Sequence, residues 1–389
     1  MPIINRIAEF HDEITAWRRD LHAHPEVLFD TARTGAIVAE KLREFGCDEV
    51  ITGLATNGVV GIINGRSTEG GRTIGLRADM DALPMTEKSG KPYASTVDGK
   101  MHACGHDGHT AMLLGAAKYL AETRNFEGRV ALIFQPAEEG GGGGKVMLED
   151  GLLDRVAIDE FYGMHNWPGM PVGTFGIRAG GIMAATDRFY IDITGKGGHA
   201  ARPHETIDPI IVGAQLVTAL QTIVSRNIDP LSSAVLSVTM MEAGEADNVI
   251  SRTAKITGTV RTLDGAVQDM IEDRLAEFVP QFAKSFGAEA SVRYARGYPV
   301  TVNTPEQTAF AANVAAEVVG VDRVDTDAPP SMGGEDFSFM LEKRPGAYIF
   351  LGNGDTSELH TDTYDFNDEA IPVGTSYWVR LVEKALPAR

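Results

Sequence analysis

Apolar residues in the first third of the chain follow two kinds of spacing, one helical and one strand-like. Residues 5–21 carry large apolar side chains three or four positions apart, which predicts an amphipathic helix. Helices are also predicted over residues 36–45 and 110–122. Short apolar runs predict buried strands, at residues 58–63, 73–77 and 129–134. Strands that alternate with helices indicate an α/β domain with a mainly parallel sheet.

The pattern changes near residue 184. Three stretches alternate apolar and polar side chains, as half-buried strands do: residues 189–193, 234–241 and 254–262. Two helices and a last strand complete the segment: residues 207–224, 266–286 and 290–294. This order is that of a ferredoxin-like βαββαβ unit. We expect a domain at residues 184–296, inserted into a larger domain formed by residues 1–183 and 297–389.

Composition narrows the classes of partner. The 389 residues include 54 acidic and 35 basic side chains, and a net charge of -19 disfavours nucleic acid and anionic membranes as partners. Only two cysteines occur, Cys47 and Cys104, which argues against a disulfide framework and for a reducing compartment. The first residues lack the apolar core of a signal peptide or membrane span. We therefore expect a cytoplasmic protein.

Histidines gather around the second cysteine. His102, His106 and His109 fall within eight residues and flank Cys104. Thiolate and imidazole are preferred ligands of zinc and similar divalent metals. A single histidine or cysteine would more often be structural, but four such residues together favour a metal site.

Two adjacent carboxylates follow a predicted strand. Glu138 and Glu139 precede five glycines, which allow a close approach of backbone and bulky groups. One carboxylate could bind metal while the other remains free as a general base. The alternative is the solvated start of a loop.

Other candidates also lie just beyond apolar runs, where α/β sheets place their chemistry. His165 and His360 each follow such a run, although a lone histidine is more often an ordinary, partly buried residue. Asp79 and Asp81 stand at a predicted strand end and could orient a ligand histidine. For Asp79, a role in capping the loop is equally consistent with the sequence.

Several motifs together resemble one known family. They are LRADMDALPM, MHACGHDGHTAMLLGAA, IFQPAEEGGGG, GMHNWP, GKGGHAARPHETIDP, ADNVI and SMGGEDFS. The set is similar to the hippurate hydrolase and N-acyl-amino-acid amidohydrolase branch of the co-catalytic dinuclear metallopeptidases. That clan also includes carboxypeptidase G and succinyl-diaminopimelate desuccinylase, and the resemblance covers nearly the whole chain.

The resemblance implies roles for individual residues. Five would hold two divalent ions (Zn, Mn, Co or Ni): Cys104, His106, Glu139, His165 and His360. Glu138 would be the general base, and Asp81 the aspartate that orients a ligand. Many relatives in the clan carry a ligand histidine where this chain has Asp79, so their ligand geometry does not transfer directly.

The resemblance also assigns the inserted domain. It implies a lid that pairs with its twin, giving a homodimer or homotetramer. His199 matches a histidine that reaches an active site and polarises the scissile carbonyl. Asn248 and Arg261 match positions associated with the substrate, and an arginine suits a carboxylate through its paired donors. Strand alternation alone would make Arg261 a surface residue.

The expected function is hydrolysis of the amide bond of N-acyl amino acids, such as acetyl or benzoyl (hippurate-like) conjugates. Metal coordination lowers the pKa of water from ~16 toward ~7, and Glu138 would accept the remaining proton. Alternatives within the clan are an N-acetyl-diaminopimelate deacetylase and a carboxypeptidase or dipeptidase. Outside it stand a non-catalytic binding protein and a thiol enzyme that uses Cys104.

Overall fold

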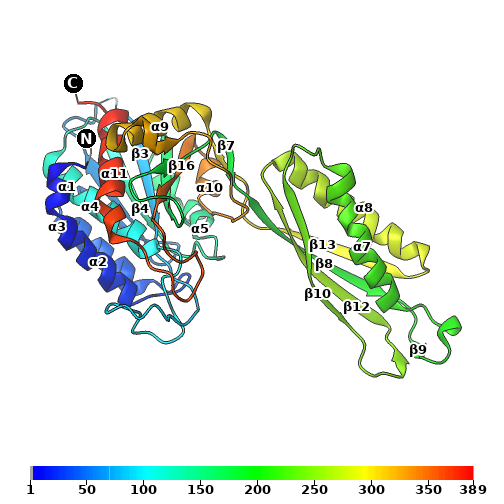
Figure 1. Ribbon diagram of the computed structural model, residues 1–389. Helices are drawn as coiled ribbons and strands as arrows, with labels where there is room; N and C mark the ends of the chain where they lie inside the picture. Colours follow the sequence, from blue (N-terminus) through cyan, green and yellow to red (C-terminus); the bar gives the residue numbers. More distant parts are fainter. Residues whose placement is uncertain (1–2, 70, 389) are drawn as a thin grey trace. The chain divides into compact units, whose positions relative to one another are not determined.

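The computed structural model describes residues 3–69 and 71–388, which form two compact units (Figure 1). The large unit comprises Met1–Gly180, Val302–Pro329 and Asp336–Arg389. The small unit comprises Gly181–Thr301 and Pro330–Glu335. The chain passes between the units near β7 (Gly180–Met183) and β14 (Thr301–Asn303). Each unit has its own apolar core.

An eight-stranded sheet organises the large unit, in the order β1-β2-β4-β3-β5-β16-β6-β15. The four central strands β4, β3, β5 and β16 run parallel, which confirms the predicted α/β class. β1, β2 and β6 introduce the antiparallel pairs. The strands are β1 (Glu49–Leu54), β2 (Gly58–Asn64), β3 (Thr73–Asp79), β4 (Arg129–Gln135), β5 (Glu160–Trp167), β6 (Phe175–Gly176), β15 (Val324–Asp325) and β16 (Gly346–Gly352).

The helices of the large unit enclose this sheet. They are α1 (Asn5–Glu9), α2 (His11–Ala23), α3 (Ala32–Glu44), α4 (His106–Thr123), α5 (Gly143–Glu149), α6 (Leu152–Arg155), α9 (Pro305–Val319), α10 (Ser338–Leu341) and α11 (Ile371–Ala385). Residues 106–117 of α4 are all buried, because α2, α3 and α11 pack around it. The single helix predicted over residues 5–21 is wrong: α1 and α2 meet at Phe10, whose buried ring anchors the break.

The small unit has the βαββαβ order that the sequence predicts. Its antiparallel sheet has the order β10-β12-β8-β13, with α7 and α8 packed on one face. Asp208 and Asp264 cap these two helices by accepting from backbone N–H groups. The elements are β8 (Ala185–Thr194), α7 (Pro209–Asn227), β10 (Ala234–Ala243), β12 (Thr253–Thr262), α8 (Gly265–Ser285) and β13 (Glu289–Arg296). A separate two-stranded ribbon pairs β9 (Gly198–His199) with β11 (Val249–Ile250).

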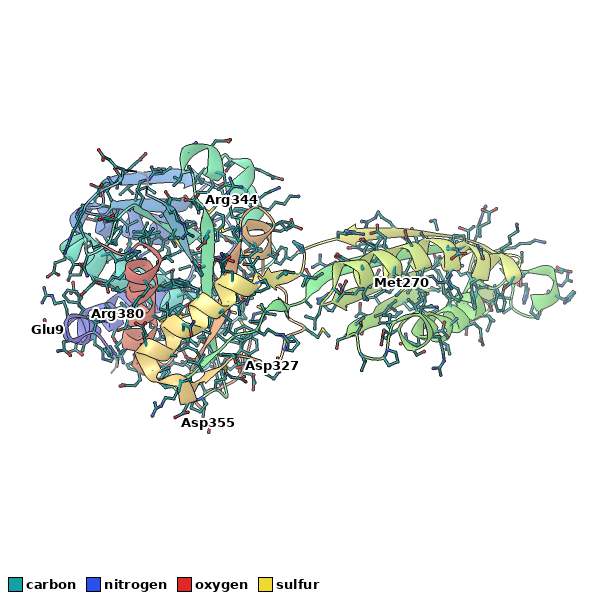
Figure 2. All side chains as sticks on the ribbon, turned by 90° about the horizontal axis from the view of Figure 1, so that it is seen from above. Glu9, Met270, Asp327, Arg344, Asp355 and Arg380 are labelled. Atoms are coloured by element: carbon teal, nitrogen blue, oxygen red, sulfur yellow. The ribbon has the colours of Figure 1, made fainter. Side chains whose placement is uncertain are left out.

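Surface composition fits the net charge. Glu9, Asp327 and Asp355 are among the exposed acidic side chains (Figure 2). Within the described residues, α7 is the one helix long and apolar enough to cross a membrane by length and composition alone. One side of α7, including Leu216 and Leu220, packs into the core of the small unit.

Candidate metal centre

The candidate site lies at the carboxyl ends of the central strands and the start of α4. His106 is the first residue of the helix, and Cys104 lies two positions before it. Gly105 between them has φ +96°. A Cβ at this position would lie 2.1 Å from Asn166 Oδ1 and 2.6 Å from the Tyr364 hydroxyl. Only glycine therefore allows the tight approach that turns Cys104 and His106 toward the same space.

The predicted ligands from four separate segments converge here. Cys104 Sγ lies 3.3 Å from His165 Nε2, and candidate ligand atoms of both residues lie within 4.8 Å of one on His106. Cys104 also forms such a group with Glu139 and His360. His106 forms a further group with the two adjacent glutamates. We call this set the Cys104 cluster: Cys104, His106, Glu138, Glu139, His165 and His360.

Two positions of the cluster depend on uncommon backbone conformations. His360 has φ +61°, and its backbone N–H donates to the Ala103 carbonyl at 2.8 Å. Ala137, directly before the paired glutamates, has φ +58°. Non-glycine residues in this region carry strain of ~1–3 kcal/mol, which concentrates at functional sites. The strain directs Glu138, Glu139 and His360 into one space.

Asp81 organises both sides of the cluster. Its carboxylate accepts from the backbone N–H groups of Glu138 (2.8 Å) and Glu139 (3.1 Å). Its backbone carbonyl lies 2.7 Å from His106 Nδ1. That contact makes Nδ1 the protonated nitrogen and leaves Nε2 of His106 as the ligand atom. The carboxylate of Asp81 therefore acts on the glutamate turn, and its carbonyl acts on the histidine.

Asp79 and His109 contact one another at the side of the cluster, where Asp79 Oδ2 also lies 3.6 Å from His106 Nε2. His109 Nδ1 lies 2.6 Å from Asp79 Oδ1, and His109 Nε2 lies 2.7 Å from Asn166 Oδ1. The other Asp79 oxygen accepts from Arg77 at 2.7 Å. Both ring nitrogens of His109 and both oxygens of Asp79 are thus engaged by the protein. This favours the supporting role for His109, and for Asp79 it favours orienting a histidine over capping a loop.

A second group of buried charges lies beside the first, and it was not predicted from the sequence. Asp107 Oδ2 lies 2.8 Å from both Arg18 Nε and His22 Nδ1. Glu87 and Asp365 complete these ion pairs. We call this set the Arg18 cluster: Arg18, His22, Glu87, Asp107 and Asp365. Arg18 lies on the apolar face of α2, and a charged residue at a core position of a helix was the signal that could have revealed it.

His102 lies two residues before Cys104 but is a member of neither cluster. It is buried, and neither ring nitrogen has a hydrogen-bond partner among the described residues. Burial lowers the pKa of His102 to about 3, so the ring is neutral. This placement is consistent with a structural role.

The electrostatics of the Cys104 cluster favour a cation. Burial raises the pKa of the Cys104 thiol well above its usual value, and Glu139 and Glu138 raise it further. Burial alone would lower the pKa of His106, but Asp79 and Asp81 outweigh it and raise the pKa to about 10. Burial lowers the pKa of His165 well below its usual value, leaving a neutral imidazole. A field that holds a proton on His106 attracts a metal ion equally.

The donor atoms fit a divalent metal. His106 Nε2 is buried and has no hydrogen-bond partner within residues 3–69 and 71–388, and leaving such an atom unsatisfied costs ~1–3 kcal/mol. The buried oxygen Glu139 Oε1 lies 3.2 Å from His360 Nε2, so a nitrogen and an oxygen donor face one another there. Sulfur, imidazole nitrogen and carboxylate oxygen are together the donor set of zinc and neighbouring metals. The convergence of histidines and paired glutamates on Cys104 favours a metal site over a thiol enzyme.

The predicted residues of the small unit fall into two places. His199 and Asn248 are exposed neighbours on the β9–β11 ribbon, where the Ala200 N–H donates to the Asn248 carbonyl at 3.0 Å. Arg261 is half-buried on β12, with Nη1 donating to the Val260 carbonyl at 2.9 Å. It pairs with Thr186, near the start of β8, whereas the ribbon follows the end of β8. The two places are about 25 Å apart along the strand direction.

Family comparison matches this architecture. Residues 75–384 match the model of peptidase family M20/M25/M40. The chain belongs to this family. Its members cleave amide bonds, and the chain is accordingly an amide hydrolase.

Relatives within the M20 family share the full length of the chain. A hippurate hydrolase from Campylobacter jejuni is 41% identical over 99% of this chain and all of the relative. An N-acetyl-L-cysteine deacetylase from Bacillus subtilis is 42% identical over 96% of this chain and 88% of the relative. The crystal structure of the Bacillus subtilis YXEP protein, described as a dinuclear metal-binding M20 peptidase, superposes with a TM-score of 0.86. That protein is 36% identical, and the match covers 97% of this chain and 99% of that one.

Proposed function

We propose that this M20 protein hydrolyses N-acyl amino acids with two divalent ions held by the Cys104 cluster. The convergence of Cys104, His106, Glu139, His165 and His360 beside Glu138 carries the proposal. The donor groups overlap through shared residues, which suits two adjacent ions better than one. The names of the Campylobacter and Bacillus relatives support the substrate class.

Glu138 would act as the general base. Bound divalent ions would supply a nucleophile at neutral pH and polarise the amide carbonyl. Glu138 is 7% exposed, and Asp81 fixes its backbone, so its carboxylate has a defined position in a poorly hydrated site. It would take the proton of the attacking water and return it to the nitrogen of the departing amino acid.

His199 suits the role of a donor to the carbonyl oxygen. Its Nδ1 accepts from the Ala201 N–H at 3.1 Å, which leaves the proton of a neutral ring on Nε2. The exposed Nε2–H can then stabilise the oxyanion that forms as water attacks. Asn248 on the same ribbon and Arg261 on β12 would bind the amino-acid carboxylate.

Two copies of the chain would be needed to assemble this site. His199 and Arg261 lie at opposite ends of the small-unit sheet, about 25 Å apart along the strands, which exceeds the length of an N-acyl amino acid. We therefore infer a homodimer, or a homotetramer built from dimers. In it the small unit serves as lid and dimerisation domain. One subunit supplies His199 and Asn248, which share the β9–β11 ribbon, to the substrate that Arg261 of the other subunit binds.

The edge strand β10 would form the dimer contact. β10 has β12 as its neighbour at this edge of the sheet, and it exposes the apolar side chains of Val235, Met240 and Met241. Unpaired strand edges with apolar side chains favour pairing with another chain. Sedimentation of wild type and Met240→Lys would test this, because a dimer that used another surface would survive the substitution.

A substrate and metal screen tests the catalytic proposal. Chelated protein is supplied with zinc, manganese, cobalt or nickel and assayed with hippurate, N-acetyl amino acids, N-acetyl-diaminopimelate and dipeptides. We expect hydrolysis of N-acyl amino acids only after metal is restored, since mixed S, N and O donors accept all four metals. Activity that survives complete chelation would refute the proposal. The cytoplasm is the proposed compartment, because Cys104 must stay reduced to bind metal.

A further inference from the structure

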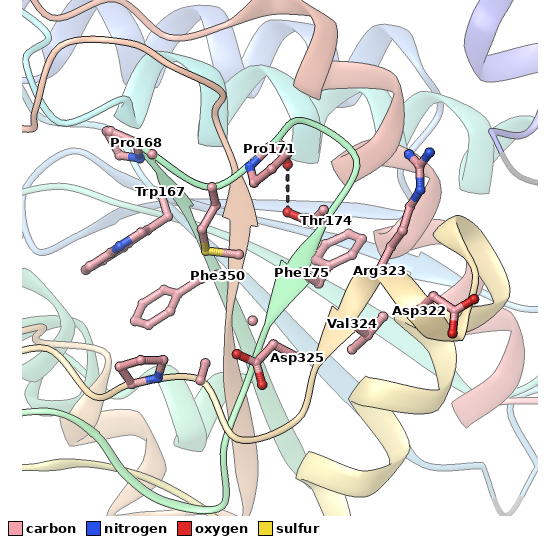
Figure 3. Close-up of a pocket in the computed structure, with 15 residues that line it drawn as sticks. Trp167, Pro168, Pro171, Thr174, Phe175, Asp322, Arg323, Val324, Asp325 and Phe350 are labelled. Atoms are coloured by element: carbon pink, nitrogen blue, oxygen red, sulfur yellow. Dashed lines mark hydrogen bonds between the residues drawn. The ribbon is translucent and has the colours of Figure 1, made fainter.

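A hollow in the large unit is lined by Trp167, whose ring neighbours that of the proposed ligand His165. It has a volume of about 540 Å³, within the usual range for small-molecule sites (Figure 3). The loop after β5 forms one wall, closed by the hydrogen bond from Thr174 Oγ1 to the Pro171 carbonyl at 2.6 Å. Residues 322–329 form the opposite wall. We call this hollow the Trp167 pocket.

Strand register connects the pocket to a proposed metal ligand. His165 and Trp167 are two residues apart on β5, so their side chains share one face of the sheet. Phe350 of β16 is the register partner of His165, and Gly176 of β6 is the partner of Phe350. The pocket therefore extends sideways from the metal centre along one face of the sheet.

The distances between aromatic rings show how close the Trp167 pocket lies to His165. The ring centroids of His165 and Trp167 are 6.2 Å apart, and those of Trp167 and Phe350 are 4.1 Å apart. The acyl group of a substrate bound beside His165 would therefore need to extend by about this ring separation to reach Trp167. An aromatic ring there could pack against Trp167 and Phe350, worth ~0.5–1.5 kcal/mol beyond simple burial.

Small residues keep the pocket open. A Cβ on Gly176 would lie 3.2 Å from Ala328 Cβ and 3.3 Å from Met170 Cε. Gly176 is not at a positive φ, so its backbone does not require glycine, and the space is the remaining reason for the missing side chain. Asp322, Arg323 and Asp325 are exposed and leave the floor apolar.

We propose that the Trp167 pocket holds the acyl group of the substrate and selects aromatic or branched acyl groups over acetyl. This inference rests on the proposed amidohydrolase function and names its substrate class more closely. The floor of Trp167, Phe350 and Met170 has the chemistry to recognise a benzoyl ring. An acetyl group would leave most of the pocket unfilled and gain little from it.

Filling the pocket tests the proposal. Ala328→Leu places a bulky side chain inside it, and Gly176→Ala narrows it with less risk to folding. We expect kcat/KM for hippurate to fall by about tenfold or more in either variant, while kcat/KM for an N-acetyl amino acid stays within about twofold. Ala309→Leu, at an exposed position of α9, is the matched control and should change neither value.

The outcomes separate this inference from the proposed function. Equal losses for both substrates, or none for either, would refute the acyl pocket while leaving the amidohydrolase function standing. If the metal-loaded wild type cleaves neither substrate, both proposals fail.

Binding of the acyl product gives a readout independent of turnover. Benzoate should change the fluorescence of wild-type protein, and Trp167→Phe should remove that change, because Trp17 and Trp378 lie on helices away from the pocket. Ala328→Leu should weaken benzoate binding by about tenfold. Acetate should produce little change in fluorescence. Benzoate binding that Ala328→Leu leaves intact would overturn the proposal.

Discussion

Two buried clusters meet at the start of α4, and they differ in how the negative charge of their buried side chains is compensated. His106 belongs to the Cys104 cluster, and the next residue, Asp107, belongs to the Arg18 cluster. In the Arg18 cluster a permanent guanidinium cation lies 2.8 Å from the buried carboxylate. In the Cys104 cluster the close neighbours of Cys104 and Glu139 are imidazoles, whose charge depends on a proton.

The difference separates structure from chemistry. In the Arg18 cluster, Arg18 and protonated His22 give each carboxylate a cationic partner within the protein, so the cluster serves to hold α2 against α4. Imidazoles can release their protons and bind a metal ion in their place. The adjacent residues His106 and Asp107 thus serve different roles, metal binding and stability. We expect that each role can be changed by mutation without changing the other.

Glu138→Gln should give the largest effect and act on the Cys104 cluster alone. Loss of a general base costs ~10²–10⁴-fold in kcat. Metal content and the unfolding transition should stay near those of wild type, because Asp81 holds the backbone of residue 138 and not its carboxylate. Turnover with restored metal and metal analysis provide the measurement. Glu149→Gln, at an exposed pair with Lys145, is the control, and comparable losses in both variants would remove Glu138 from its proposed role.

Arg18→Leu should give the next largest effect and act on stability. Removing one partner of a buried pair costs about 3–5 kcal/mol, and here it leaves the buried Asp107 carboxylate with His22 as its remaining close cation. Arg19→Leu is the matched control, because Arg19 is adjacent on α2 and contacts Asp368 at 2.8 Å but is 46% exposed. That pair should contribute about 0–1 kcal/mol. Urea unfolding of the large unit measures both, and similar losses would contradict a structural role that depends on burial.

The contrast also explains what the sequence could predict. Periodicity predicted the α/β class and the small unit closely, because β-branched runs and helical stripes report burial directly: the predicted helix at 110–122 and strand at 129–134 match α4 and β4. Motif resemblance supplied the candidate metal ligands, and the structure brings them together. Their roles as ligands stay predictions.

Contacts between residues far apart in the chain could not be predicted from the sequence. The sequence around Arg18 does not indicate that Asp107, 89 positions away, is its partner. The packing of α2 on α4 brings the two residues together. The break between α1 and α2 depends in the same way on a tertiary site for the Phe10 ring. The Trp167 pocket combines β5 and β6 with β16, which is distant from them in sequence and whose register cannot be read from local patterns.

The stability that His22 contributes within the Arg18 cluster should depend on pH. Burial alone would lower the pKa of His22, but Asp107 and Glu87 raise it from 6.5 to about 9. A raised pKa means that charged His22 stabilises the fold fully below pH 6.5 and that this contribution is lost as the pH rises through 9. The advantage of wild type over His22→Gln in unfolding free energy should fall by about 3 kcal/mol between those limits. An advantage independent of pH would show that His22 contributes packing only.

Metal-dependent stabilisation should give the smallest effect and identify the Cys104 cluster. A ligand at a hundredfold excess over its Kd stabilises the folded state by ~2.7 kcal/mol, so zinc added to chelated protein should raise Tm. Cys104→Ser should lose most of that rise, because a serine hydroxyl is a far poorer ligand than thiolate. Cys47→Ser is the matched control: Cys47 lies just after α3, outside the cluster, and its variant should keep the full rise. Arg18→Leu should start from a lower Tm and keep the rise as well, since Arg18 contacts none of the proposed metal ligands. If Arg18→Leu lost the metal response while Cys104→Ser kept it, the division of labour across the start of α4 would be reversed.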